Sequence, residues 1–297
     1  MSALSELPSD VLGLVRSVPL SRRGFMTASA ASAAGYALCA GEVRADVITT
    51  DTTGLETGEA KVTVSGGEMP VYFAKPANAA NAPVILVCME IFGLHEYIRD
   101  VTRRLAKLGA FAVAPDYYFR AGTDLTKITE VPKLLPIVNA KPDQELLADL
   151  DATVAWAKAE GGDTGRLGIV GFCRGGRTVW IYAAHNAELK AGVAYYGSLV
   201  DPEGQKAILP KSPLELAPEV KAPVLGLYGG ADQGIPVSQV EAMQSALKAA
   251  GKTAEIKVYP DAPHAFHADY RPSYREEVAK QAWQEMETWF KTHGVLG

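Results

Sequence analysis

Apolar and polar positions alternate along this chain in two different patterns, which together predict an α/β fold. Short apolar runs typical of buried parallel strands occur at 82–90, 110–116, 167–171, 190–196 and 223–229, and a last strand is expected at 254–259. Segments with helical spacing of apolar residues stand between and after them, at 95–108, 143–160, 174–186, 236–250 and 274–291. Regular alternation of strands and helices predicts a mostly parallel sheet with helices on both faces.

An antiparallel element precedes this pattern. The segment KVTVSGGEMPVYFAKP (61–76) alternates apolar and polar residues on both sides of two glycines, which predicts a β-hairpin. Two stretches, 118–142 and 200–222, fit no regular element. Both follow predicted strands, where parallel sheets carry their chemistry, so they either shape the mouth of a pocket or are ordinary surface loops.

The first 45 residues differ in character from the rest of the chain. The segment SRRGFMTASAASAAGYALCAGEVRAD (21–46) combines paired arginines, an alanine- and serine-rich stretch and small residues before Asp46. It resembles a twin-arginine export signal, the alternative being an alanine-rich surface helix. The stretch is too short and too rich in serine to span a membrane. We therefore expect a signal peptide at 1–45, recognised by the twin-arginine export machinery, and a periplasmic or secreted mature protein at 46–297 without a membrane anchor.

The composition of the mature chain is that of an ordinary globular domain. Removing the leader, which holds four basic and three acidic residues, changes the formal net charge from −5 to −6. Nothing in this balance favours nucleic acid or an anionic membrane as a partner. Of the three cysteines, Cys39 belongs to the leader, and Cys88 and Cys173 alone are too few for a disulfide framework.

The segment LGIVGFCRGG (167–176) contains the candidate nucleophile. Cys173 lies between Gly171 and Gly175, at the junction of a predicted strand and a predicted helix. This is the pattern of a nucleophile elbow, whose sharp turn admits only small residues two positions either side and exposes the nucleophile above the sheet. The backbone N–H of Arg174 would then point at the reacting carbonyl oxygen, and the helix N-terminus would favour a thiolate. The alternative is a buried structural cysteine.

A thiol nucleophile needs a base and an acid that orients the base. Asp232 follows the strand at 223–229 within YGGADQGIP, and His264 follows the strand at 254–259. Nucleophile, acid and histidine thus come in the chain order that the elbow fold requires. Asp261 is a rival acid, but it precedes His264 on the same loop and is expected to shape the turn.

The other histidines are weaker candidates. His95 and His185 are expected in helices, His293 lies near the chain end, and His267 would point away from the base. A metal site built from HAFH and Asp269 would lack a third ligand at fixed spacing, so no metal is expected.

Five segments together resemble the dienelactone hydrolases (carboxymethylenebutenolidases) of the α/β-hydrolase superfamily, over nearly the whole mature chain. They are MEIFGLHEYIRD, APDYYFR, GIVGFCRGG, YGGADQGIP and HAFHADYRPSY. The resemblance implies an enzyme that cleaves a small, carboxylate-bearing ester or lactone through a thioester acyl-enzyme, with Cys173, Asp232 and His264 as the catalytic triad and no metal or organic cofactor.

The same resemblance implies roles for further residues. Glu90 would contact the resting thiol and control its ionisation; the alternative is that Glu90 is a solvated acid on a loop. The N–H of Ile91 would be the second donor to the oxyanion, beside the N–H of Arg174. Arg120 would hold the substrate carboxylate, unless it is a surface arginine. The family has a second carboxylate-binding arginine four residues after the histidine, where this chain has Ala268. Arg271 is the suggested replacement, and the departure leaves the identity of the ester open.

Three other functions fit parts of the pattern. A broader carboxylesterase or thioesterase would use the same triad. A thiol redox sensor would use Cys88 and Cys173, which lie near the ends of neighbouring predicted strands, although Cys88 falls within an apolar run and is expected to pack. A binding module without catalysis would keep the pocket but has no need of the ordered triad.

The leader hypothesis predicts the start of the exported protein. Expressed in a native host, the secreted form should begin at or close to Asp46, because signal peptidase cleaves after small residues such as those before it. N-terminal sequencing of the exported protein is the measurement. An exported protein that retained residues 1–45 would contradict the prediction.

Overall fold

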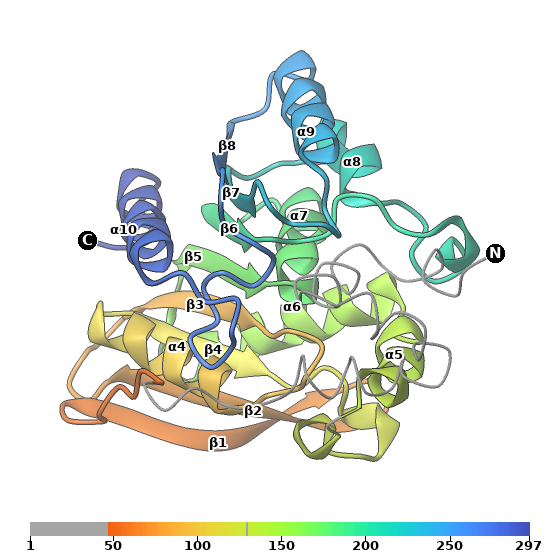
Figure 1. Cartoon of the computed structure of the whole chain (residues 1–297). Helices are drawn as coiled ribbons and strands as arrows, with labels where there is room; N and C mark the ends of the chain where they lie inside the picture. Colours follow the sequence, from red (N-terminus) through yellow and green to blue (C-terminus); the bar gives the residue numbers. More distant parts are fainter. Residues whose placement is uncertain (1–46, 129) are drawn as a thin grey trace.

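An eight-stranded sheet runs through the molecule in the order β1-β2-β4-β3-β5-β6-β7-β8 (Figure 1). The computed structural model describes residues 47–128 and 130–297, so the expected signal peptide lies outside the described residues. The edge strand β1 pairs antiparallel with β2, β2 pairs antiparallel with β4, and every other pair is parallel. The strands are β1 Leu55–Val64, β2 Gly67–Pro76, β3 Pro83–Cys88, β4 Phe111–Pro115, β5 Asp163–Phe172, β6 Ala191–Tyr195, β7 Val224–Gly229 and β8 Ala254–Tyr259.

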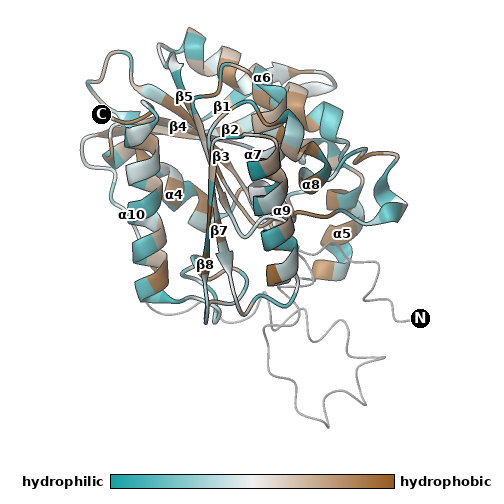
Figure 2. Ribbon diagram, turned by 90° about the horizontal axis from the view of Figure 1, so that it is seen from above, coloured by the Kyte–Doolittle hydropathy of each residue, from teal (hydrophilic) through white to brown (hydrophobic). Residues whose placement is uncertain are grey.

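Helices cover both faces of this sheet, which confirms the predicted α/β architecture. Figure 2 shows α4 and α10 on one side and α6, α7 and α9 on the other. The helices are α4 Glu96–Lys107, α5 Val131–Asn139, α6 Asp143–Ala159, α7 Arg174–His185, α8 Pro213–Leu216, α9 Val237–Ala249 and α10 Glu276–Thr292. Within the described residues, no helix is both long and apolar enough to cross a membrane.

Burial of the central strands explains their apolar runs. Every residue of β3, β4, β6 and β7 is buried, because helices pack against both sides of each. The edge strand β8 is half exposed and alternates in sequence. The predicted hairpin is present, turning at Gly66 and Gly67 with φ of 86° and 142°, a conformation that favours glycine.

The parallel registers bring the carboxyl ends of five strands together. Cys88 at the end of β3 pairs with Gly171 of β5, which pairs with Ala194 of β6. Further along, Gly229 of β7 pairs with Tyr259 of β8. The segments that follow these strands therefore emerge at one edge of the sheet, where this topology places its chemistry.

The two stretches without a predicted element contain short helices, and buried charges fasten the segments next to them. α5 lies in the first stretch and α8 in the second. Arg177 on α7 makes two bonds to Asp143, at 2.7 and 2.9 Å, and also pairs with Asp201 at the start of the second stretch. All three side chains are buried. The guanidinium thus fastens α6 and the loop after β6 to the helix that follows Cys173.

Removing Arg177 should destabilise the whole fold. In Arg177→Met, two buried carboxylates lose their shared counter-charge, so the free energy of unfolding should fall by about 3–5 kcal/mol. Urea denaturation followed by circular dichroism is the measurement. Arg275→Met is the matched control, because the Arg275 guanidinium is exposed and donates only to backbone carbonyls. Equal stabilities of the two variants would contradict the prediction.

Candidate active site

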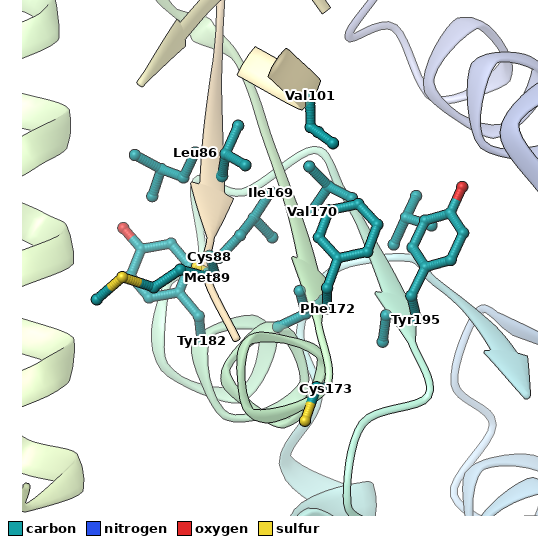
Figure 3. Close-up of a cluster of buried hydrophobic side chains, with 14 of the residues drawn as sticks. Leu86, Cys88, Met89, Val101, Ile169, Val170, Phe172, Cys173, Tyr182 and Tyr195 are labelled. Carbon is teal, nitrogen blue, oxygen red and sulfur yellow. The ribbon is translucent and has the colours of Figure 1, made fainter. Parts of the chain in front are cut away.

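Cys173 occupies a strained turn between β5 and α7. Its φ of 55° and ψ of −118° lie in a region that non-glycine residues rarely adopt, and it is the residue that caps the N-terminus of α7. Figure 3 shows its sulfur at the start of this helix, pointing away from Cys88. The predicted strand–turn–helix is therefore present, with the backbone conformation that a nucleophile elbow requires. The expectation that the turn exposes the thiol is wrong for this structure, because the Cys173 side chain is fully buried.

Two glycines make this turn sterically possible. A Cβ atom at Gly171 would lie 2.0 Å from the carbonyl oxygen of Gly175, and one at Gly175 would lie 2.1 Å from the carbonyl oxygen of Cys88. Both distances are far inside van der Waals contact with backbone atoms, which cannot move aside. The small residues on either side of Cys173 are thus required by the close approach of β3, β5 and α7.

Backbone hydrogen bonds hold the turn in place. The N–H of Cys173 donates to the carbonyl of Tyr195 at the end of β6, at 3.1 Å, and the Cys173 carbonyl accepts from Gly176 and Arg177. The first amides of α7, that of Arg174 among them, make no intrahelical bond, as at any helix start. Ile91 is buried three residues beyond β3, the neighbour of β5, so its amide belongs to the adjacent strand end.

Asp232 and His264 form a direct pair on the loops after β7 and β8. Nδ1 of His264 lies 2.7 Å from Oδ2 of Asp232, and both residues are buried. The other carboxylate oxygen accepts the N–H groups of Gly234 and Ile235, which fixes its direction. Nε2 of His264 is buried without a hydrogen-bond partner among the described residues. The rival Asp261 is exposed at its turn.

Glu90 lies in a buried polar cluster, and the alternative of a solvated loop acid is wrong. Its side chain is fully buried, and Oε2 accepts the hydroxyl of Tyr270 at 2.7 Å. Nε2 of His95 lies 3.4 Å from the same oxygen, at salt-bridge distance but without good hydrogen-bond geometry. Burial acts to raise the pKa of Glu90, but His95 and Arg271 outweigh it, and the net pKa is lowered. The group is therefore a carboxylate at neutral pH.

Arg271 belongs to the same cluster, while its suggested role in binding a substrate carboxylate stays a prediction. Its guanidinium lies over the rings of Phe92 and Tyr270, at 4.7 and 5.3 Å from their centroids, and Nε donates to the Tyr270 hydroxyl. Burial acts to lower its pKa, but Tyr270 and Glu90 and also Cys173 act to raise it, and the net pKa is raised. Cys173 is thus one of the groups whose charge acts on this guanidinium.

Arg120 has other partners. Its guanidinium makes two 2.8 Å bonds to Asp149 and also donates to the carbonyl of Ser65. It lines a cavity of about 400 Å³ together with Tyr117, Tyr118 and residues of α5. None of its polar partners belongs to the cluster around Cys173, so the expected role of Arg120 in binding a substrate carboxylate stays a prediction, with its charge already matched by Asp149.

Sequence reasoning missed three residues of the cluster. His95 was expected inside a helix but caps the start of α4 instead, which turns its ring toward Glu90. Tyr270 is next to Arg271 in the segment HAFHADYRPSY, yet nothing in the sequence spacing indicates that it is a residue of the site. Tyr196 has a φ of 38° and its ring centroid lies 5.0 Å from that of His264. Its pKa is raised by burial, to which Glu90 and Cys173 add.

The remaining candidates lie apart from this chemistry. His267 is buried with Nδ1 2.7 Å from the Tyr97 hydroxyl, and burial lowers its pKa to about 3, so it is neutral. Asp269 pairs with Arg104 at 2.6 Å. No group of three potential metal ligands occurs among the described residues. Cys88 is buried in β3, where burial raises its pKa, and forms no disulfide.

Comparisons with known proteins identify the family. The profile of the dienelactone hydrolase family matches residues 69–294. A protein of Methylorubrum extorquens described as "Putative carboxymethylenebutenolidase" is 50% identical over 295 residues, which cover 98% of this chain and 100% of the relative. One with the same description from Escherichia coli K12 is 48% identical over 263 residues, covering 88% and 96% of the two chains.

A solved structure gives the same result. The crystal structure described as a "Putative Dienelactone Hydrolase" from Klebsiella pneumoniae matches with a TM-score of 0.77 and 50% identity, covering 80% of this chain and 98% of its own. Sequence and fold agree over the region that carries Cys173, Asp232 and His264. The chain therefore belongs to the dienelactone hydrolase family, a family of hydrolases that act on lactones or esters.

Proposed function

We propose that this protein hydrolyses a small, carboxylate-bearing ester or lactone through a thioester acyl-enzyme formed on Cys173. The observation that carries the proposal is the strained turn at Cys173, set at the same sheet edge as the bonded pair of Asp232 and His264. A positive φ on a non-glycine residue is costly, and such strain is retained where a nucleophile has to be held on a sharp turn.

Acylation of Cys173 is the first half of the reaction. Nε2 of His264 takes the thiol proton as Sγ attacks the carbonyl carbon, and the oxyanion accepts the amides of Ile91 and Arg174. The C–O bond then breaks, and His264 gives its proton to the leaving oxygen. In a lactone that oxygen stays in the same molecule as the acyl group.

Hydrolysis of the thioester completes the cycle. His264 removes a proton from water, the resulting hydroxide adds to the thioester carbonyl, and the C–S bond breaks to return the cysteine and release the carboxylic acid. Asp232 orients the imidazole throughout. Its bond to Nδ1 leaves Nε2 as the basic nitrogen, and it stabilises the imidazolium that forms.

Glu90 and Arg271 would couple substrate binding to thiol ionisation. A carboxylate beside a thiol disfavours the thiolate, so the buried, charged Glu90 keeps the resting cysteine protonated. A substrate carboxylate that pairs with Arg271 would compete with Glu90 for this guanidinium, which already acts on both Glu90 and Cys173. Displacement of Glu90 would then release the thiolate when substrate is present.

The site of action and the alternative thiol chemistry complete the proposal. Residues 1–45 would direct export by the twin-arginine route, so the enzyme would act in the periplasm or outside the cell.

A redox sensor built on Cys88 and Cys173 is disfavoured, because burial raises the pKa of Cys88 and suppresses the reactive thiolate. A broader carboxylesterase or thioesterase would use the same steps with a less selective pocket.

Loss of Cys173 should abolish hydrolysis. The wild-type protein should cleave dienelactone more efficiently than a neutral aryl acetate, because the lactone carries a carboxylate for Arg271. Cys173→Ala should reduce turnover of both substrates to background, with the circular dichroism spectrum unchanged. Cys173→Ser should keep a small fraction of the activity, since an alkoxide forms less readily than a thiolate. Spectrophotometric kinetics of each variant provide the test. Undiminished turnover by Cys173→Ala would end the mechanism.

Removal of the Glu90 charge should make the resting thiol more reactive. Without a neighbouring carboxylate more thiolate is present at neutral pH, so iodoacetamide should alkylate Cys173 about three- to tenfold faster in Glu90→Gln than in the wild type. Peptide mass mapping locates the label. Glu285→Gln serves as the control, because that carboxylate binds Tyr259 and Lys257 at the outer strand β8. Equal rates in wild type and Glu90→Gln would remove Glu90 from the proposed role.

A further inference from the structure

Two buried arginines beside Cys173 have no carboxylate partner. The described residues include four buried arginines, Arg103, Arg174, Arg177 and Arg271. Arg103 pairs with Glu96 and Asp100, and Arg177 pairs with Asp143 and Asp201. Neither Arg174 nor Arg271 makes a salt bridge with a described carboxylate, and each has one buried guanidinium nitrogen without a hydrogen-bond partner among these residues, Nη1 in Arg174 and Nη2 in Arg271.

Arg174 is the less explained of the two. It immediately follows Cys173, and only 5% of its surface is exposed. Its charge acts on Tyr117, whose hydroxyl donates to the carbonyl of Met89 at 3.0 Å, one residue before Glu90. Tyr117 thus connects the charge of Arg174 with the segment after β3 that also supplies Glu90 and Ile91.

The charges around Cys173 do not balance. Asp232 is bonded to His264, so Glu90 is the described carboxylate that remains to compensate the charges of Arg174 and Arg271. Glu90 interacts electrostatically with Arg271. A buried arginine without a counter-charge loses hydration that its surroundings do not replace, which is unfavourable. Arg120 shows the opposite case, because its positive charge is already compensated by a salt bridge with Asp149. A site that keeps an unmatched guanidinium next to its nucleophile is suited to an anionic ligand.

We propose that the Arg174 side chain is a second carboxylate-binding group of this site, in addition to its backbone N–H. The inference rests on the proposed function and narrows its substrate class to esters or lactones with a carboxylate close to the scissile bond. Arginine suits this task because its planar guanidinium can bind a carboxylate with two parallel hydrogen bonds. Arg174 would thereby take the task that the family resemblance gives to Arg120.

Alkylation of the full chain by two matched reagents tests this without requiring hydrolysis. Iodoacetate and iodoacetamide react identically: Sγ displaces iodide from the CH₂ carbon, a C–S bond forms and the thiol proton is lost to His264 or to water. The reagents differ in that iodoacetate carries a carboxylate next to the reacting carbon. The ratio of their rates at Cys173, located by peptide mass mapping, reports anion binding beside the sulfur and cancels changes in thiol reactivity.

Arg174→Gln should lower the iodoacetate-to-iodoacetamide ratio by about tenfold, the loss of one charge-assisted hydrogen bond. Arg174→Lys should keep most of the ratio, because it keeps the charge. Arg275→Gln is the control for net charge and should leave the ratio at the wild-type value, since Arg275 is exposed. Arg174→Met, with a side chain of similar stem length and no charge, provides the same test if the glutamine variant does not fold by circular dichroism.

A ratio unchanged in the uncharged variants, or lowered equally in Arg174→Lys and Arg174→Gln, would overturn the inference. Neither result would touch the proposed function, which the ester assays test separately. Conversely, a protein that cleaves no ester but shows the expected fall in ratio would keep the anion subsite and lose the hydrolase mechanism.

Discussion

The contact between the end of β5 and the start of α7 is the constraint on which the rest of the site depends. Gly171 and Gly175 approach so closely that a Cβ on either would overlap backbone atoms of the other segment or of β3. This contact accompanies the positive φ of Cys173 and sets Cys173, the proposed nucleophile, at the N-terminus of a helix. The parallel registers then align the ends of the neighbouring strands with that turn. Ile91, Asp232 and His264 lie on the segments that follow these strand ends.

Buried charge organises the surroundings of the turn in two different ways. Along α7, Arg177 is matched by two carboxylates and fastens the segments around it. Next to Cys173, Arg174 has no carboxylate partner among the described residues, whereas Arg271 is linked to Glu90 through the Tyr270 hydroxyl. A matched buried charge is compensated by its partners, whereas a buried guanidinium without a carboxylate partner is an incompletely compensated charge. The same residue type thus supports the fold in one place and, in our proposal, would bind the substrate carboxylate in another.

Much of the fold could be predicted because its signals are local. Apolar runs marked the central strands, and Gly66–Gly67 marked the hairpin turn. Boundaries were less certain where tertiary contacts override the pattern: β1 begins at Leu55, several residues before the predicted hairpin, since its partner β2 extends the pairing to Pro76. The predicted helix at 95–108 begins one residue later, at Glu96, and this difference frees His95 to face Glu90. The short helices of the second unassigned stretch are held by the long-range pair of Asp201 and Arg177, which no local spacing reveals.

The sequence by itself determined the order of strands and helices, the glycine-flanked cysteine between a strand and a helix, and the chain order of Cys173, Asp232 and His264. These features follow from periodicity and from steric rules that act within a few residues. Only the tertiary structure decided how the buried charges pair. It joined Arg120 to Asp149 and brought Tyr270 and His95 to Glu90, and within 47–128 and 130–297 it gave Arg174 no carboxylate partner. Pairing of this kind depends on distances between segments up to 180 residues apart, as for Tyr270 and Glu90, and such distances exist only once the chain has folded.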